Sequence, residues 1–448
     1  MADELLINGT PWWRNVNMAM IEDARSRSQV NASRPTTPPP APVPAAAHTV
    51  SASPPSAPPV ADLSTTPPPA PVPAAAHTAS ASPPSAPPVA DLSYIPGPRT
   101  TLAPEDTVKG ADYPNVEQPE PPKWYNDILH GTLQKTPRPL PEVDEHLNKI
   151  TSGIKNCINA VGRKTAPSPA DFEKINDGIH RAFFLDLTAT TIRKRRLLHN
   201  DTGLPRIFCS TLSGGVEYPW YLKEDAAELY IKWWSRDTDP GLFRGIRLGR
   251  QKNVRLGREG TVDKFLPNYT GRRHGDFHGN GPLRNGQWWP SQLCAMRDGA
   301  HNATVAGICG DSIGAFSCVM SGGSYPNIDR GEEVWYYGTE SEDPTRPTDS
   351  TQYMINSSRS HEPVRLLRAS KMTTEGSNDF RPAEGLRYDG VYEVVGYEIK
   401  NVAKQVHLFH LVRLPGQTPI RSSGLGVRPT PEELEALAKI KIEKKYLA

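Results

Sequence analysis

Apolar residues recur at the spacing of amphipathic helices between residues 143 and 235. The first predicted helix carries one stripe, made of Val143, Leu147, Ile150, Ile154, Ile158 and Val161. A second begins at Ser168, where Ser-Pro-Ala-Asp supplies an N-cap, a proline at the first helical position and an acid in the first turn. Two more are predicted over 189–199 and 222–235, the last with Trp233 and Trp234 facing inward. The pattern predicts a small helical bundle over residues 123–243.

Beyond Pro240 the chain changes to short apolar runs separated by Gly, Asn and Asp, which are typical of strands and turns. The runs are ATVAGI, AFSCVM, GVYEVVGYEI and HLFHLVRL. Their regular recurrence favours a curved antiparallel sheet or barrel over parallel units. At the end, Thr430-Pro431-Glu432-Glu433 forms a capping box that starts a charged helix ending at Tyr446, within a C-terminal segment 426–448.

The region 1–122 has a different composition. Of the 47 prolines, 26 lie between Pro35 and Pro122, where large apolar side chains are scarce, so we expect disorder. Residues 36–64 recur at 65–93 with one change, a repeat of 29 residues. Two Pro-Ala-Ser copies offer no face to bury, which indicates a polyproline-like tether. A docking site for a proline-recognising partner is the alternative.

Charge and cysteine content set limits on the compartment. The formal charge is only +2, from 51 basic and 49 acidic residues, so any nucleic-acid contact must rest on local clusters. The five cysteines are an odd number without a Cys-x-x-Cys pair, which argues against zinc ribbons and a secreted disulfide framework. The sequence shows no signal peptide and no long apolar run. We expect a soluble protein in a reducing compartment, without a membrane partner.

One local cluster is strongly basic. Between Arg244 and Arg273 nine basic residues face two acids, in a glycine-rich stretch predicted as a linker over 244–274. Glycines let the backbone approach a ligand, so the run suits phosphate contacts that position a protein on DNA. The candidate phosphate-binding residues are Arg247, Arg250, Lys252, Arg255, Arg272 and Arg273. A solvated basic loop is the alternative.

From His274 onward, six motifs follow in a fixed order: HGDFHGNGPLRNGQWW, VAGI, SGG, IDRGE, PVRLLR and RYDGVYEV. This order resembles the SRA (SET and RING-associated, or YDG) family over residues 275–425. Arg387-Tyr388-Asp389-Gly390 corresponds to the motif that names the family, where its role is structural.

The helical region shows a second resemblance. Its motifs TTIRKRRLL and LKEDAAELYIKWW are similar to the N-terminal bundle of transcription elongation factors. The basic run RKRR is also a candidate nuclear import signal, or else an ordinary solvated helix face.

The resemblance implies a bowl-shaped sheet that takes a 5-methylated cytosine out of duplex DNA and holds it after the Gly322-Gly323 turn. Flipping lets a pocket surround the whole base, stack on its faces and hydrogen-bond its pairing edge. The cost of unstacking, about a few kcal/mol, must be offset by those contacts and by a side chain that fills the vacated space. Double-stranded DNA is the partner implied, and no cofactor is expected.

The family's pocket can be transferred by counting from Gly322-Gly323 without gaps. The second stacking tyrosine falls on Tyr336, and the first falls on Ser324, with Tyr325 one place later. The base-reading aspartate falls on Asn327, an amide that lacks the charge-assisted hydrogen bond, so weaker or relaxed base selectivity is expected. The predicted base pocket comprises Gly307, Gly323, Ser324, Tyr325, Asn327, Tyr336 and Tyr337.

Two further positions concern the strands of the duplex. Val305 corresponds to the family's thumb residue, which enters the gap left by the base, although a residue in VAGI can equally belong to the core. The family's longer finger is here the short acidic TESEDPTRPTDSTQ, with Arg346 as its only basic tip. Recognition of the opposite strand is therefore not expected.

Catalysis is not expected. His274 and His278 flank Asp276 and suggest a metal or nuclease site, but supporting cysteines, paired carboxylates and a Ser/His/Asp arrangement are missing. The sequence predicts a nuclear α+β protein: a disordered tail, a helical bundle and an SRA-type barrel that reads methylated cytosine. The alternative is a scaffold with a degenerate pocket that recruits histones or other chromatin and transcription proteins. A modification-dependent nuclease is a third reading without a visible site.

Overall fold

The computed structural model describes residues 6–7, 10–11, 113–249, 263–321, 325–370 and 379–446. Most of the predicted disordered region, including both repeats, lies outside the described residues. The chain divides into two units, residues 1–89 and 90–448. In the first unit, β1 (Leu6–Ile7) and β2 (Thr10–Pro11) form an antiparallel pair.

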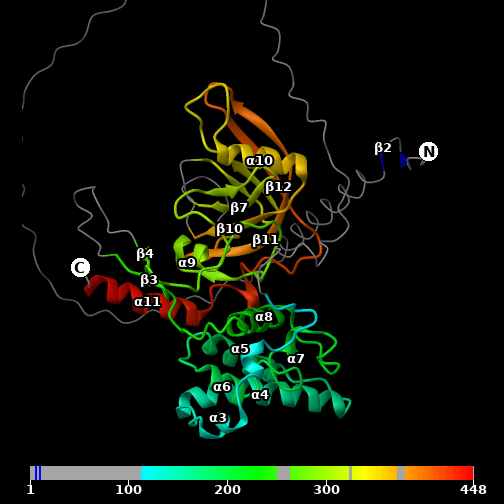
Figure 1. The fold of residues 1–448 in the computed structure, drawn as a ribbon. Coiled ribbons are helices and arrows are strands. Elements are labelled where there is room, and N and C mark those ends of the chain that lie inside the picture. Colours follow the sequence, from blue (N-terminus) through cyan, green and yellow to red (C-terminus); the bar gives the residue numbers. More distant parts are fainter. Residues whose placement is uncertain are drawn as a thin grey trace, which may run out of the picture. The chain divides into compact units, whose positions relative to one another are not determined.

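The second unit contains the helices and the main sheet (Figure 1). Its helical part consists of α2 (Lys123–Asn126), α3 (His130–Lys135), α4 (Pro141–Gly162), α5 (Pro169–Ala182), α6 (Ala189–Lys194), α7 (Pro205–Phe208) and α8 (Trp220–Trp234). Ser168 caps α5 as predicted, because its side chain accepts a hydrogen bond from the Asp171 amide. The predicted third helix is too long: it ends at Lys194, where Arg196 adopts a φ of 55° and turns Leu197 and Leu198 into the core.

The bundle core runs between α4, α5 and α8. Glycines allow α4 and α5 to approach closely, since a Cβ on Gly153 would lie 2.4 Å from Cγ1 of Ile175. Trp233 of α8 is buried as predicted, whereas Trp234 is only partly covered. Both Trp234 and Tyr230 donate hydrogen bonds to the Glu120 carbonyl. The folded chain therefore extends back into residues 113–122, ahead of the predicted start at 123.

The sheet-bearing part follows a small antiparallel pair, β3 (Ile246–Arg247) with β4 (Lys264–Phe265). The main sheet consists of β5 (Trp288–Trp289), β6 (Ile308–Gly310), β7 (Ala315–Met320), β8 (Ile328–Asp329), β9 (Glu333–Tyr337), β10 (Val364–Ala369), β11 (Leu386–Asn401) and β12 (Val406–Arg413). The other elements are α9 (Gln292–Arg297), α10 (Asp349–Ser360), a short 3-10 turn (Gly424–Gly426) and α11 (Pro431–Tyr446).

The topology is that of an α+β fold, but it departs from the predicted antiparallel barrel in two ways. The strand order is β6-β7-β10-β11-β12-β9-β8, with β5 paired to β11, and the described strands β6 and β8 are not joined, so the sheet stays open. β10 also pairs with β7 in parallel. The connection from β7 to β10 contains the β8–β9 hairpin and α10, which is long enough for the crossover that a parallel pair needs.

A cluster of buried ion pairs joins the helical part to the sheet-bearing part. Asp225 of α8 is fully buried and pairs with both Arg421 and Arg428. Arg428 also contacts Glu228 of α8 and Glu433 of α11. The segment after β12 therefore ties the two parts of this unit together, with α11 lying beside them (Figure 1).

Candidate nucleic-acid interface

The candidate pocket is built from β9 and the loops before β6 and β8. Tyr336 of β9 is 6% exposed, and its hydroxyl lies 3.3 Å from the Val319 carbonyl and 3.4 Å from that of Gly307. Gly307 must be glycine for this contact, because a Cβ there would lie 2.8 Å from the Tyr336 hydroxyl oxygen. The structure therefore brings Tyr336 and Gly307 together on the buried face of the sheet.

The loop that carries Val305 is fastened by His301. Nε2 of this buried histidine lies 2.8 Å from the Ala306 carbonyl, and Nδ1 lies 2.8 Å from Oγ of Ser317. Burial lowers the pKa of His301 to about 4, so its ring is neutral at physiological pH. Val305 itself is 87% exposed and is not a core residue. The arrangement holds a free apolar side chain at the tip of an anchored loop.

Tyr325, Asn327 and Tyr337 form a second group, which we call the tyrosine slot. The rings of Tyr325 and Tyr337 are nearly parallel, at 14°, with centroids 6.4 Å apart. Asn327 is hydrogen-bonded to the backbone of both tyrosines. Its backbone N–H donates to the Tyr325 carbonyl at 2.9 Å, and its side-chain Oδ1 accepts from the backbone N–H of Tyr337 at 2.8 Å. Because neighbours alternate along β9, Tyr337 points to the opposite face from Tyr336.

Several predicted residues stand apart from these two groups. Gly323 and Ser324, and the basic residues Arg250, Lys252 and Arg255, lie outside the described residues. Arg346 is exposed in the acidic loop before α10, with Nε 3.5 Å from Asp343. That loop reaches the slot, since the Glu340 amide donates to the Tyr325 hydroxyl at 3.1 Å.

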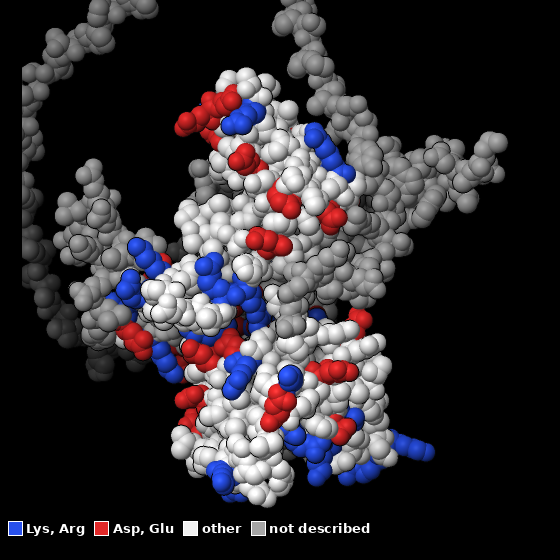
Figure 2. Space-filling view, in the orientation of Figure 1, with Lys and Arg blue, Asp and Glu red and all other residues white. Residues whose placement is uncertain are grey.

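The remaining phosphate-binding candidates lie near the β3–β4 pair. Arg247 is exposed, and Arg272 is exposed with its guanidinium 4.3 Å from the Phe265 ring centroid. Arg273 donates to Oγ of Ser235 at 2.8 Å. On the face in Figure 2, Lys and Arg gather around α11 with acids among them, and the sheet-bearing part also shows acids and bases mixed. Arg244, from the same basic run, is paired with Asp237 and Asp298 instead of facing solvent.

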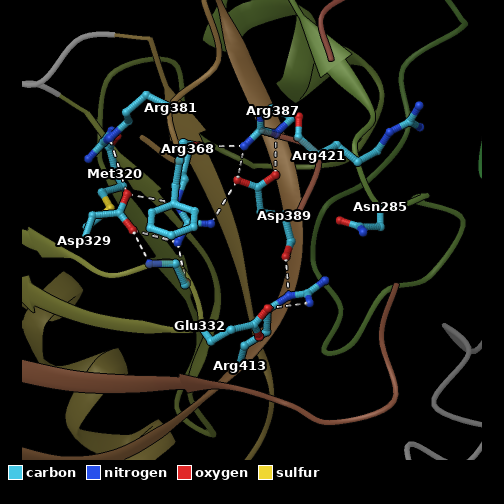
Figure 3. Close-up of polar contacts among 12 residues, drawn as sticks. Asn285, Met320, Asp329, Glu332, Arg368, Arg381, Arg387, Asp389, Arg413 and Arg421 are labelled. Carbon is cyan, nitrogen blue, oxygen red and sulfur yellow. Dashed lines mark hydrogen bonds and ion pairs between the residues drawn. The ribbon is translucent and has the colours of Figure 1, made fainter. Parts of the chain in front are cut away.

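A buried network of arginines and aspartates braces the sheet beneath the pocket (Figure 3). Arg368 of β10 donates two hydrogen bonds of 2.9 Å to Asp329 and one of 2.9 Å to Asp389. Arg387 holds the same Asp389 carboxylate through two contacts. Burial raises the pKa of Asp389, but Arg387 and Arg368 outweigh it, so the net shift is downward. Asp389 is thus a structural residue, as the family resemblance implies.

Sequence reasoning did not identify two further arginines. Arg381 donates to the carbonyls of Met320 and Ala369 and so ties the end of β7 to the end of β10. Arg365 is fully buried, has no carboxylate partner among the described residues, and donates to the carbonyls of Gly275, Phe277, Gly279 and Ala300. For Arg365 the available signal was the motif PVRLLR, in which Arg365 and Arg368 interrupt a strand that is otherwise apolar. That motif does not include Arg381.

The residues considered for metal binding or nucleophilic catalysis do not assemble such a site in the described part of the chain. No group of three or more His, Cys, Asp or Glu side chains is placed to hold a metal ion there. Cys309 lies 3.4 Å from Nε2 of His301, but that nitrogen already faces the Ala306 carbonyl and burial raises the pKa of the thiol.

Within the described residues, no helix has the length and apolarity required to cross a membrane.

These features define a class of domain. It is an open, curved sheet that buried arginines brace, with a glycine-rich loop and an edge that carries tyrosines. Residues 278–417 match the family profile of the SAD/SRA domain. This part of the chain is an SAD/SRA domain, and the predicted membership is confirmed for it.

Individual relatives match over the same limited length. The chain is 33% identical over 129 residues to a UHRF1-like protein of Cryptococcus neoformans var. grubii, covering 24% of this chain and 36% of that protein. It is 31% identical over 139 residues to the E3 ubiquitin-protein ligase UHRF1 of Rattus norvegicus, covering 25% and 18%. The SUVH5 SRA domain, solved with hemimethylated CG DNA, is 24% identical with a TM-score of 0.26, covering 32% of this chain and 95% of that one. The match thus spans only about a third of the length of the Cryptococcus protein and less than a fifth of the length of the rat UHRF1.

Proposed function

We propose that this protein is a non-catalytic reader of 5-methylated cytosine in double-stranded DNA, and that it works in the nucleus. The SAD/SRA domain over residues 278–417 carries the proposal. The geometry supports it, because the pocket residues Tyr336 and Gly307 lie together and Val305 projects from an anchored loop. Base flipping is the mechanism proposed, with Val305 entering the vacated space.

The proposed chemistry divides the work between two surfaces. Arg247, Arg272 and Arg273, with the basic residues of 250–262, contact phosphates and position the domain without reading sequence. The pocket residues supply the discrimination, because they surround the base after it leaves the stack. Arg346 is the only basic side chain at the tip of the acidic loop, so the second strand contributes little.

A titration at fixed salt tests the proposal. We expect the full chain to bind hemimethylated or fully methylated duplexes more tightly than unmodified ones, with hydroxymethylated DNA as a third probe. Equal affinity for all of them would leave the alternative, a scaffold for histones or transcription proteins, as the better function. The salt slope alone does not decide, because phosphate contacts produce it in either case.

Val305→Ala provides a matched variant. The side chain is 87% exposed, so its truncation should not change the melting temperature, but it should weaken binding to methylated duplexes. Val402→Ala, on a valine that is 68% exposed at the β11–β12 turn, is the control and should bind like the parent chain.

A further inference from the structure

The small β3–β4 hairpin places two like charges opposite each other. Its register pairs Ile246 with Phe265 and Arg247 with Lys264, so each pair shares one face of the hairpin. Ile246 is buried and Phe265 is partly buried, whereas Arg247 and Lys264 are both exposed. Like charges that face each other directly across two strands are destabilising. An anion bound by both cations would relieve that repulsion, so the pair is a candidate anion-binding site.

The hairpin offers these two cations little counter-charge. Among the described residues between 245 and 273, Asp263 is the one acidic residue. Its carboxylate is turned to the base of the hairpin, where Oδ1 accepts a hydrogen bond from the backbone N–H of Gly249 at 2.8 Å. Within the part of the chain that the structure describes, neither Arg247 nor Lys264 forms an ion pair with a carboxylate. The two exposed cations are therefore available to an external anion.

The helix α11 holds the base of the hairpin and takes up the charge of Asp263. Nζ of Lys444 lies 2.8 Å from Oδ2 and 3.1 Å from Oδ1 of Asp263, and 5.1 Å from the centroid of the Phe243 ring. The first turn of α11 is fixed in the buried ion pairs, where Glu433 contacts Arg428. The helix thus connects the hairpin with the junction between the helical and sheet-bearing parts (Figure 1). A two-stranded hairpin is only marginally stable alone, so this support sets where its cations lie.

We propose that Arg247 and Lys264 form a clamp for phosphates of the DNA backbone, and that α11 positions the clamp through the ion pair between Lys444 and Asp263. This inference rests on the proposed function, and it extends the phosphate contacts to Lys264 and to a helix outside the matched SAD/SRA profile. Duplex DNA is the ligand because the hairpin lies directly ahead of the domain that begins at His278. Lys444 is a positioning residue, since it contacts Asp263 and not the phosphate.

The clamp is tested in the full chain with Arg247→Gln and Lys264→Gln combined. The affinity for a labelled duplex is measured by fluorescence anisotropy across a salt series, with methylated and unmodified DNA. Each neutralised phosphate contributes about 0.9 to the slope of log affinity against log salt, so the slope should become shallower by about 1 to 2. Both duplexes should lose affinity equally, because phosphates carry no sequence information. An unchanged slope would overturn the clamp.

The role of α11 is tested by Lys444→Gln. This variant should weaken DNA binding about three- to tenfold at low salt and make the slope shallower, and Lys444→Arg, which keeps the ion pair, should recover most of the affinity. Lys441→Gln is the matched control: it removes the same charge from the same helix, but Lys441 pairs with Glu384 and not with the hairpin. It should stay within about twofold of the parent chain. If Lys441→Gln weakens binding as much as Lys444→Gln, the helix acts through its net charge and the positioning role is wrong.

Asp263→Asn gives a test of opposite sign. It makes the hairpin more positive, so an effect of net charge alone would tighten DNA binding. Loss of the contact with Lys444 should instead weaken it, and tighter binding would overturn the positioning role. Failure of the parent chain to prefer methylated over unmodified DNA would reject the proposed function, whereas the salt slopes of these variants would still decide the clamp.

Discussion

Asp389 shows how much one buried carboxylate supports in this domain. It receives hydrogen bonds from Arg368 and Arg387, and all three side chains are 0% exposed. Arg368 also holds Asp329, at the end of β8, and so connects the interior strand β10 with the edge strand β8. Removing one charge therefore leaves two buried guanidinium groups with too few acceptors.

We predict that Asp389→Asn destabilises the protein by about 3–5 kcal/mol, the usual cost of breaking a buried ion pair from one side. Chemical denaturation followed by tryptophan fluorescence measures the change. Asp343→Asn, in the exposed loop before α10, is the control and should change stability by less than about 0.5 kcal/mol. A similar small effect for Asp389→Asn would show that the network does not brace the sheet.

Among the elements, α11 depends most clearly on a local cap. The Thr430 amide donates to Glu433 at 2.7 Å, and the Glu433 amide donates to Oγ1 of Thr430 at 3.3 Å, which is the predicted capping box. Glu433 also pairs with Arg428. The start of the helix is therefore coupled to the contact between the helical and sheet-bearing parts.

Thr430→Ala removes the capping oxygen and should lower the free energy of unfolding by about 1 kcal/mol, within a usual range of about 0.5–2 kcal/mol. Thr430→Ser keeps the oxygen and should recover most of that loss. Thermal melts of the two variants beside the parent chain make the comparison. If both variants lose the same amount, the missing methyl group and not the cap accounts for the effect.

At the scale of the whole molecule, the junction between the two parts is a buried charge cluster. Three carboxylates, of Asp225, Glu228 and Glu433, contact the two arginines Arg421 and Arg428, and Asp225 also lies 3.0 Å from Nε2 of His180. Burial raises the pKa of Glu228 to about 7, with Glu433 and Asp225 adding to the shift and Arg428 opposing it. Since this pKa lies above the ordinary value of 4.5, the folded protein binds the proton more tightly than the unfolded chain.

It follows that the stability contributed by Glu228 is greatest at low pH and decreases as the pH rises from about 4.5 through about 7. Glu228→Gln keeps an acceptor for Arg428 without the ionisation. We expect this variant to be up to about 3 kcal/mol more stable than the parent chain at pH 8, with the difference shrinking toward pH 5. Melting curves across that range provide the measurement, and Glu342→Gln in the exposed acidic loop is the control. A constant difference at every pH would contradict the assignment.

Local patterns in the sequence determined the elements. The apolar stripe from Val143, the Ser168 cap and the Thr430 capping box act within a few residues, so periodicity and capping chemistry locate α4, α5 and α11 without knowledge of the fold. The ordered motifs likewise identified the SAD/SRA domain, because each occupies a fixed place along the chain.

Tertiary structure alone decided which distant groups meet. The parallel β7–β10 pair, the open sheet and the partners of Asp225 depend on contacts between residues far apart in the chain. Counting along the chain indicated Tyr336 as a stacking residue, which stays a prediction, and only the structure shows that the rings of Tyr325 and Tyr337 lie parallel. The reason is geometric: in a strand, a shift of one position reverses the face, and strand register, which no local pattern contains, sets where each side chain points.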